Sequence, residues 1–416
     1  MMKLNDYEQA LLAGAEGRPR QQAMQQLIAV GEFFDAPDLV EISQVHLMAD
    51  TEALGEAGVD YLESLAREPL AQRRVRVPTI TDPRGADFKA WQRLKQDESF
   101  VTLEKRAIDA FRALGVMMTD TCINYQTIIP PVKGEHLAFG DTGSSIYANS
   151  VLGARTNFEG GPSALAAALT GRVPRYGFHL DSHRRGQTRF MVTEQPKDLS
   201  DWGALGGIIG RRMRSYFEVP VIDGITGKPT SDELKHFGAA LASFGSTALF
   251  HMSGITPEAP DTAAVFDGAP PQPVVLGAAD YRTFFDSFDY PDDRLDVVVF
   301  SAPQLSLVEL ESLGRLLDGR RVHADVTLIA ATSPEIKHAS DRMGITAQIE
   351  NAGGLLLEGV CFYQMHAREI GEANGWRRLM SNSAKLSNIL GGYGYETVLG
   401  SMAACVDSAI AGRILK

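Results

Sequence analysis

The sequence predicts an α/β protein in which parallel or mixed sheets are flanked by helices in α/β/α layers. An apolar run at 297–300 precedes a helical pattern at 306–317, and a second apolar run at 326–331 precedes a helix start at Ser333-Pro334-Glu335. A capping residue, a Pro at the first helical position and an acid in the first turn are a typical helix beginning. Strand–helix alternation of this kind is typical of a parallel sheet covered by helices.

Elements earlier in the chain are predicted from periodicity. Apolar residues recur at helical spacing within 5–34, 54–65 and 100–114. Alternation at 74–80 predicts a strand, and the turn residues at 82–85 would end it. A further apolar run at 355–360 predicts a third strand of the later sheet.

Composition and charge restrict the class of protein. The 416 residues contain 40 Lys and Arg against 52 Asp and Glu, a net charge of −12, which argues against a nucleic-acid partner. No apolar run reaches the length of a membrane-spanning helix, and the N-terminus lacks the apolar core of a signal peptide. We therefore expect a cytoplasmic protein that binds neither nucleic acid nor membrane.

The densest group of candidate site residues lies in the block 134–172, which is rich in glycine and in uncharged polar residues. It offers Asp141 and Thr142, then Asn149, Ser150 and Arg155. A glycine turn at 159–163 leads into an Ala-rich helical segment, an arrangement that suits either an anion site or close helix packing.

Three cysteines occur, Cys122, Cys361 and Cys405, and none forms a CxxC pair. An odd number without short spacings is a poor disulfide framework, so spacing alone indicates small buried apolar residues.

The block 134–172 resembles the catalytic large segment of the aconitase X family. Further segments carry the same resemblance: TDTCINY around Cys122, HMSGITPEAP from His251, MSNSAK ending at Lys385, and CVDSAIAGR from Cys405. The resemblance implies an aconitase-like fold and a lyase. Family members include cis-3-hydroxyproline dehydratases and phosphomevalonate dehydratase.

Through this resemblance the cysteines acquire a second interpretation. Members of the family bind an iron centre through three cysteines. The sequence segments around Cys122, Cys361 and Cys405 match the segments that carry those cysteines. Three thiolates suit a 4Fe-4S cluster, a 2Fe-2S cluster or a mononuclear iron. An iron with an open position could bind the leaving hydroxyl.

The resemblance also assigns the substrate site. Asp141, Thr142 and Lys385 are the implied catalytic residues, and Asp82, Pro83, Asn149, Ser150 and Arg155 the implied substrate-binding residues. Asp141-Thr142 replaces a Glu-Ser pair, and Asp82-Pro83 stands where several relatives have Asn-Pro. A charged Asp82 would repel an anionic substrate group or bind a cationic one.

The predicted organisation has two regions and one missing module. Residues 1–193 together with 355–416 would form the iron-centre and substrate-binding region, and residues 194–354 a separate α/β domain. Family members that are complete in one chain also carry a swivel domain that supplies a serine base, and no such domain fits here.

The predicted function is the large subunit of an iron-dependent hydro-lyase acting on a hydroxylated carboxylate, such as a hydroxyproline-type substrate. The base would lie on a small swivel-domain subunit. An aconitase-like isomerase and a non-catalytic scaffold are the alternatives.

Three other features have ordinary interpretations. His46 is expected to be a packed histidine. His179 and His183 have zinc-site spacing, but Gly177 argues against the regular helix that such a site needs. The glycines of 203–210 lack the strand–turn–helix order of a phosphate loop and indicate close helix packing.

Overall fold

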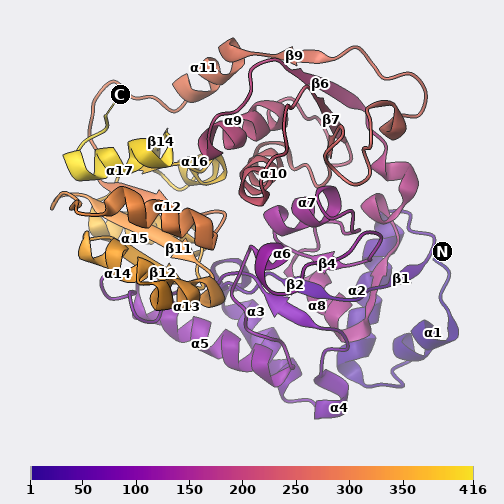
Figure 1. Cartoon of the computed structure of the whole chain (residues 1–416). Helices are drawn as coiled ribbons and strands as arrows, with labels where there is room; N and C mark the ends of the chain where they lie inside the picture. Colours follow the sequence, from indigo (N-terminus) through magenta and orange to yellow (C-terminus); the bar gives the residue numbers. More distant parts are fainter. Residues whose placement is uncertain (1, 416) are drawn as a thin grey trace.

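Three parallel sheets organise residues 2–415, which the computed structural model describes (Figure 1). The first has the order β3-β2-β4, with β2 at Val45–Leu47, β3 at Thr79–Thr81 and β4 at Ala138–Phe139. Helices pack around it: α2 (Arg18–Phe33), α3 (Thr51–Ala66), α5 (Glu98–Ala113) and α8 (Gly161–Thr170). The α/β prediction with parallel sheets flanked by helices is therefore confirmed.

The predicted strand at 74–80 is shorter than expected. Only Thr79–Thr81 pairs with β2. Upstream, Val75 N–H donates to Leu114 O at the end of α5, and Arg76 N–H donates to Ala168 O in α8. These backbone groups are thus satisfied by helix ends rather than by a neighbouring strand.

The second sheet has the order β8-β7-β6-β9. Its strands are Thr188–Val192 (β6), Pro220–Asp223 (β7), His251–Met252 (β8) and Val274–Leu276 (β9). Beside it lie α9 (Leu199–Gly210), α10 (Ser231–Gly245) and α11 (Ala278–Asp286).

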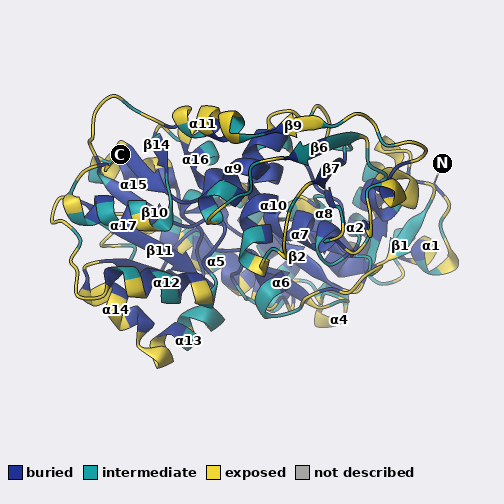
Figure 2. Ribbon diagram, turned by 45° about the horizontal axis from the view of Figure 1, so that its top comes forward, coloured by how far each residue is buried: buried dark blue, intermediate teal, exposed yellow. Residues whose placement is uncertain are grey.

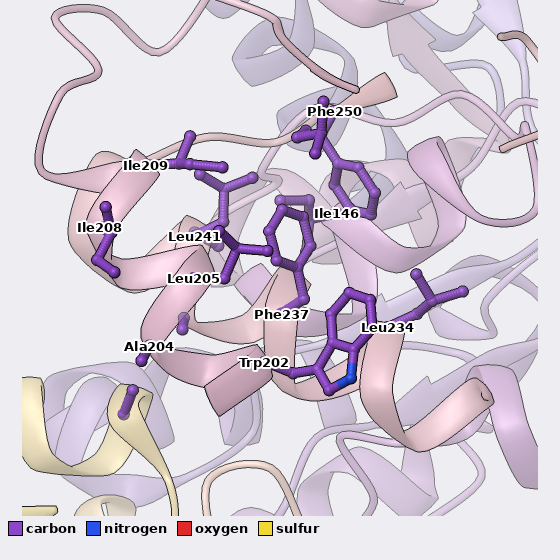
Figure 3. Close-up of a cluster of buried hydrophobic side chains, with 14 of the residues drawn as sticks. Ile146, Trp202, Ala204, Leu205, Ile208, Ile209, Leu234, Phe237, Leu241 and Phe250 are labelled. Atoms are coloured by element: carbon purple, nitrogen blue, oxygen red, sulfur yellow. The ribbon is translucent and has the colours of Figure 1, made fainter. Parts of the chain in front are cut away.

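The glycines of α9 allow close packing against α10, as the sequence predicts. A Cβ on Gly206 would lie 2.2 Å from Phe237 O in α10, a distance that no side chain could occupy. Leu205, Phe237 and Leu241 fill the apolar space between the helices and their neighbours (Figure 3).

The third sheet has the order β12-β11-β10-β13-β14, and all its pairs are parallel. The strands are Val297–Phe300 (β10), Thr327–Thr332 (β11), Leu355–Glu358 (β12), Arg378–Ser381 (β13) and Glu396–Leu399 (β14). The helices of this part are α12 (Leu307–Leu317), α13 (Pro334–Met343), α14 (Ile345–Asn351), α15 (Ala367–Asn374), α16 (Ala384–Gly391) and α17 (Met402–Ala411). The boundary predicted at residue 355 falls inside this sheet, where β11 pairs with β12.

Successive residues of the third sheet enter different cores, because side chains alternate across a strand. Val298 and Phe300 of β10 belong to one apolar cluster, and Val297 and Val299 to another. Strands are buried and outer helices such as α11, α13 and α14 carry exposed residues (Figure 2).

The remaining elements include two short strands, β1 (Leu39–Glu41) and β5 (Arg172–Pro174), that pair antiparallel with each other. The others are α1 (Asp6–Leu12), α4 (Leu70–Arg73), α6 (Asn124–Thr127), α7 (Thr142–Ser150), and the 3-10 helices Gly177–His179, Asp181–Arg184, Ala263–Val265 and Phe362–Gln364. None of the helices between residues 2 and 415 combines the length and the apolar character needed to cross a bilayer.

Candidate active site

The carboxyl ends of the first and third sheets meet around a buried polar site. Asp82 follows β3 and Asp141 follows β4, while Cys361 follows β12 and Lys385 follows β13. Parallel α/β sheets commonly bind their ligands at the carboxyl ends of strands. The connection between the sheets is direct, because Lys385 reaches Asp141 and Gln364 reaches Asp82.

Lys385 and Asp141 form a buried ion pair. Lys385 Nζ lies 3.2 Å from Asp141 Oδ1 and donates to Thr142 Oγ1 at 3.3 Å. Asp141 also caps α7, because its Oδ2 accepts from Ser144 N–H at 2.8 Å. Burial alone would raise the pKa of Asp141, but Lys385 holds it below its ordinary value. Burial opposes the charge on Lys385, yet Asp141 raises its pKa. Both groups are therefore charged at neutral pH.

Two of the three cysteines lie together beside this pair. Cys122 and Cys361 form a side-chain hydrogen bond, and together with burial it raises the pKa of Cys122 well above its ordinary value. Ser301 Oγ is 3.5 Å from Cys361 Sγ, and Gln304 N–H donates to Cys122 Sγ at 3.4 Å. The loop after β10 therefore contacts both thiols.

Asp82 is fully buried and is held by an amide. Gln364 Nε2 donates to Asp82 Oδ2 at 2.7 Å and to Asp50 Oδ2 at 3.2 Å. Burial, and then the negative charge of Asp141, raise the pKa of Asp82 well above its ordinary value. Burial thus favours the protonated form of this carboxyl over the charged form considered from the sequence.

Two more acids with raised pKa values adjoin Asp82. Burial raises the pKa of Asp50 to about 6 and that of Glu104 to about 7. Glu104 Oε2 accepts from Thr51 Oγ1 at 2.7 Å and from Gly85 N–H at 3.1 Å. His46 is buried as expected, with its Nε2 2.7 Å from Thr121 O and 3.6 Å from Asp82 Oδ1.

Several predicted substrate-binding residues make hydrogen bonds to other parts of the fold. Asn149 Nδ2 donates to Thr156 O and to Ala248 O, and Asn149 Oδ1 accepts from Thr156 N–H and Arg184 Nη1. Ser150 Oγ accepts from Phe250 N–H. Arg155 pairs with Asp181 and donates to His179 O. Pro83 follows Asp82 directly, in a buried segment.

Cys405 is not part of the thiol pair. It lies in α17 within the cluster that contains Val298 and Phe300, whereas Cys361 lies in the cluster on the opposite face of the third sheet. Among residues 2–415, no three His, Cys, Asp or Glu side chains are grouped so that they could hold a metal ion. The expected centre with three cysteine ligands therefore does not fit this structure.

The residues that sequence reasoning missed are mainly amides. Gln304 and Gln364 hold the thiol pair and Asp82, yet amide side chains carry no recognisable motif. The position of Gln304 could have indicated its role. It follows the predicted strand at 297–300, and the ends of such strands line binding sites in parallel sheets. His179 and His183 lie in two short 3-10 helices, so the regular helix of a zinc site is absent there.

Models of three successive domains match nearly the whole chain. They are described as aconitase X first domain, second domain and third domain, and they match residues 1–182, 186–286 and 295–411. The chain belongs to the aconitase X family.

Relatives and a solved structure agree with this assignment. The aconitase X chain is 35% identical over 394 residues to the phosphomevalonate dehydratase large subunit of Methanothermobacter thermautotrophicus, covering 94% of each. It is 31% identical to the cis-3-hydroxy-L-proline dehydratase of Pseudomonas aeruginosa, covering 99% of this chain and 70% of that protein. The crystal structure of Thermococcus kodakaraensis aconitase X in its holo-form matches 98% of this chain with a TM-score of 0.85 and 29% identity.

These matches confirm two predictions for this aconitase X chain. The aconitase-like fold is confirmed by the structural match. The enzyme class is a hydro-lyase of the aconitase X type, since the relatives are dehydratases.

Proposed function

We propose that this chain is the large subunit of a hydro-lyase that dehydrates a small hydroxylated carboxylate of the hydroxyproline type. The observation that carries the proposal is the buried Lys385–Asp141–Thr142 group beside Cys122 and Cys361, where the two sheets meet. A charged lysine, a hydroxyl and a helix N-terminus converge there, and each of them favours a carboxylate.

The number of cations favours a substrate with one anionic group. Lys385 contacts Asp141 and Thr142, while Arg84 on the Asp82 side is already bound to Asp120 and to Glu358 O. A single lysine, itself paired with Asp141, suits one carboxylate better than a carboxylate plus a phosphate. The carboxylate of Asp141 would also favour the ring ammonium of a hydroxyproline.

Dehydration needs a proton to leave the α-carbon and the hydroxyl to leave as water. As the base removes the α-proton, the electrons of that C–H bond form the double bond and the C–O bond breaks. The departing hydroxyl then takes up a proton. The neutral Asp82 can supply that proton, because its Oδ1 has no hydrogen-bond partner within residues 2–415.

The base is proposed to lie on a small swivel-domain subunit, a partner that the name "large subunit" of the phosphomevalonate dehydratase relatives supports. An iron ion or an iron–sulfur cluster is the proposed cofactor. Cys122 and Cys361 are the thiols of this chain that meet at the site.

The test is reconstitution with the small subunit under anaerobic conditions. Hydroxyproline isomers, phosphomevalonate and simple hydroxy acids would be assayed for alkene formation with each subunit alone and with both. We expect turnover of a hydroxyproline-type acid by the complex only. Equal turnover by the large chain alone would place the base here, and preferential turnover of phosphomevalonate would refute the substrate assignment.

A further inference from the structure

We infer that this chain offers a metal two thiolates, Cys122 and Cys361, and that Cys405 is a core residue with no part in the site. The inference rests on the proposed function only for the expectation that a metal binds there. The three-cysteine set that the sequence suggests is thereby replaced by a pair.

The third sheet separates Cys405 from Cys361. Cys361 follows the edge strand β12, whereas α17, which carries Cys405, packs against β10 and β13 in the middle of the sheet. The two cysteines also lie in different cores: Cys361 packs with Val297 and Val299, whereas Cys405 packs with residues of the opposite face.

The surroundings of Cys405 are those of a small apolar residue. Its side chain is fully buried, and its Sγ has Gly400 O at 3.8 Å as its hydrogen-bond partner. Val406 and Ala409 of the same helix join it in the cluster.

The Cys122–Cys361 pair, by contrast, is held in place by a dedicated residue. Gln304 Nε2 donates to Asp120 O and to Val360 O, each at 3.1 Å, so it ties together the two segments that carry the cysteines. Gln304 Oε1 also accepts from Cys122 N–H at 3.1 Å. A fully buried amide with this many partners fixes the separation of the two thiols.

The loop that contacts both thiols offers no replacement for a third thiolate. Between β10 and α12, Ser301 and Gln304 make the contacts, and Ala302 and Pro303 lie between them. A metal bound here must therefore complete its coordination with ligands from outside this set, such as water, inorganic sulfide, substrate or a group of the partner subunit.

Cobalt(II) is a direct probe, because the charge-transfer absorption of a Co(II)–thiolate complex grows with the number of thiolate ligands. The full chain with its small subunit would be loaded anaerobically with Co(II), and in parallel with Fe(II) and sulfide. Wild type would be compared with Cys122→Ala, Cys361→Ala and Cys405→Ala. Val406→Ala is the matched control, since Val406 is buried in the same helix and core.

We expect Cys405→Ala and Val406→Ala to retain the wild-type charge-transfer intensity and iron content. Cys122→Ala and Cys361→Ala should each lose at least half of the intensity. Loss of metal in Cys405→Ala but not in Val406→Ala would overturn the inference, and Cys405→Val would repeat the comparison if the alanine variant does not fold. Failure of the wild-type complex to take up either metal would overturn both the two-thiolate site and the proposed cofactor. Dehydration by a metal-free complex would refute only the iron dependence of the proposed function.

Discussion

The two ends of helix α7 differ although the sequence marks both with the same kinds of residue. At its N-terminus, Asp141 and Thr142 meet Lys385 from the third sheet. At its C-terminus, Asn149 and Ser150 hold the loops at 156 and 248–250 in place. A helix of nine residues is about 13 Å long, so one end can serve chemistry while the other serves the fold.

The difference teaches that a motif is not the same as a site. The block 134–172 is dense in hydroxyls, amides and charges, yet only its first part faces the thiol pair. Asn149 makes four hydrogen bonds within the chain, which leaves its amide no capacity for substrate. The predictions below test this division, from the largest expected effect to the smallest.

The largest effect is expected at Lys385. Lys385→Met removes the cation proposed to bind the carboxylate and leaves Asp141 charged and buried without its partner. Breaking a buried ion pair costs about 3–5 kcal/mol, and we expect kcat/KM of the reconstituted complex to fall at least about 100-fold. The double variant Asp141→Asn/Lys385→Met should recover stability but not activity. Near-normal activity in folded Lys385→Met would remove this residue from the site.

At the other end of α7, Asn149→Ala should lower the stability of the fold without changing the rate of the catalysed reaction. It leaves two carbonyls and one N–H group without the amide partner in a buried setting, while Arg184 Nη1 keeps only its bond to Phe178 O. Each unsatisfied group costs about 1–3 kcal/mol, so we expect a loss of about 3 kcal/mol in urea unfolding, partly offset by relaxation. The kcat/KM of the folded fraction should stay within about threefold of wild type. A selective rise in KM would instead restore Asn149 to the substrate site.

These residues show which features could be predicted from the sequence and which could not. Strand–helix alternation predicted the third sheet, and helical periodicity predicted α3 and α5, because those signals are local. Lys385 and Asp141 are 244 positions apart in the chain, and only a resemblance to a family could bring them together beforehand. The resemblance groups Cys405 with Cys122 and Cys361, whereas we infer a pair, because a sequence match does not show which face of a sheet a helix covers.

The raised pKa of Asp82 could not be predicted either, since it depends on total burial beside Asp141. Asp82→Asn therefore removes a proton donor without removing a charge. We expect kcat to fall about 10–100-fold with KM nearly unchanged, as for loss of a general acid. Steady-state kinetics of the complex is the measurement. A lower KM for anionic substrates would show instead that Asp82 is charged and repels them.

Glu104 provides a pH test of the raised pKa values next to the site. Its pKa of about 7 exceeds the ordinary value of 4.5, so the folded protein keeps a proton that the unfolded chain releases between those pH values. The free energy of unfolding therefore falls as pH rises through this window, by up to about 3 kcal/mol for this group. Glu104→Gln cannot ionise and should lose less stability between pH 5 and 8 than wild type in urea titrations. Parallel curves for the two proteins would contradict the raised pKa.

The smallest effect is expected at Arg155, a residue from the same block as Asp141. Its guanidinium pairs with Asp181, whose side chain is 87% exposed, and it donates to His179 O. Exposed ion pairs contribute about 0–1 kcal/mol, so Arg155→Ala should change the unfolding free energy by no more than about 1 kcal/mol. Because Arg155 makes no contact with Lys385 or Asp141, kcat and KM should stay within about twofold of wild type. Arg155→Lys is the matched control, since it keeps the charge and loses the planar donor. If alanine raises KM about tenfold while lysine does not, Arg155 binds substrate through its charge, and the division between the two ends of α7 is wrong.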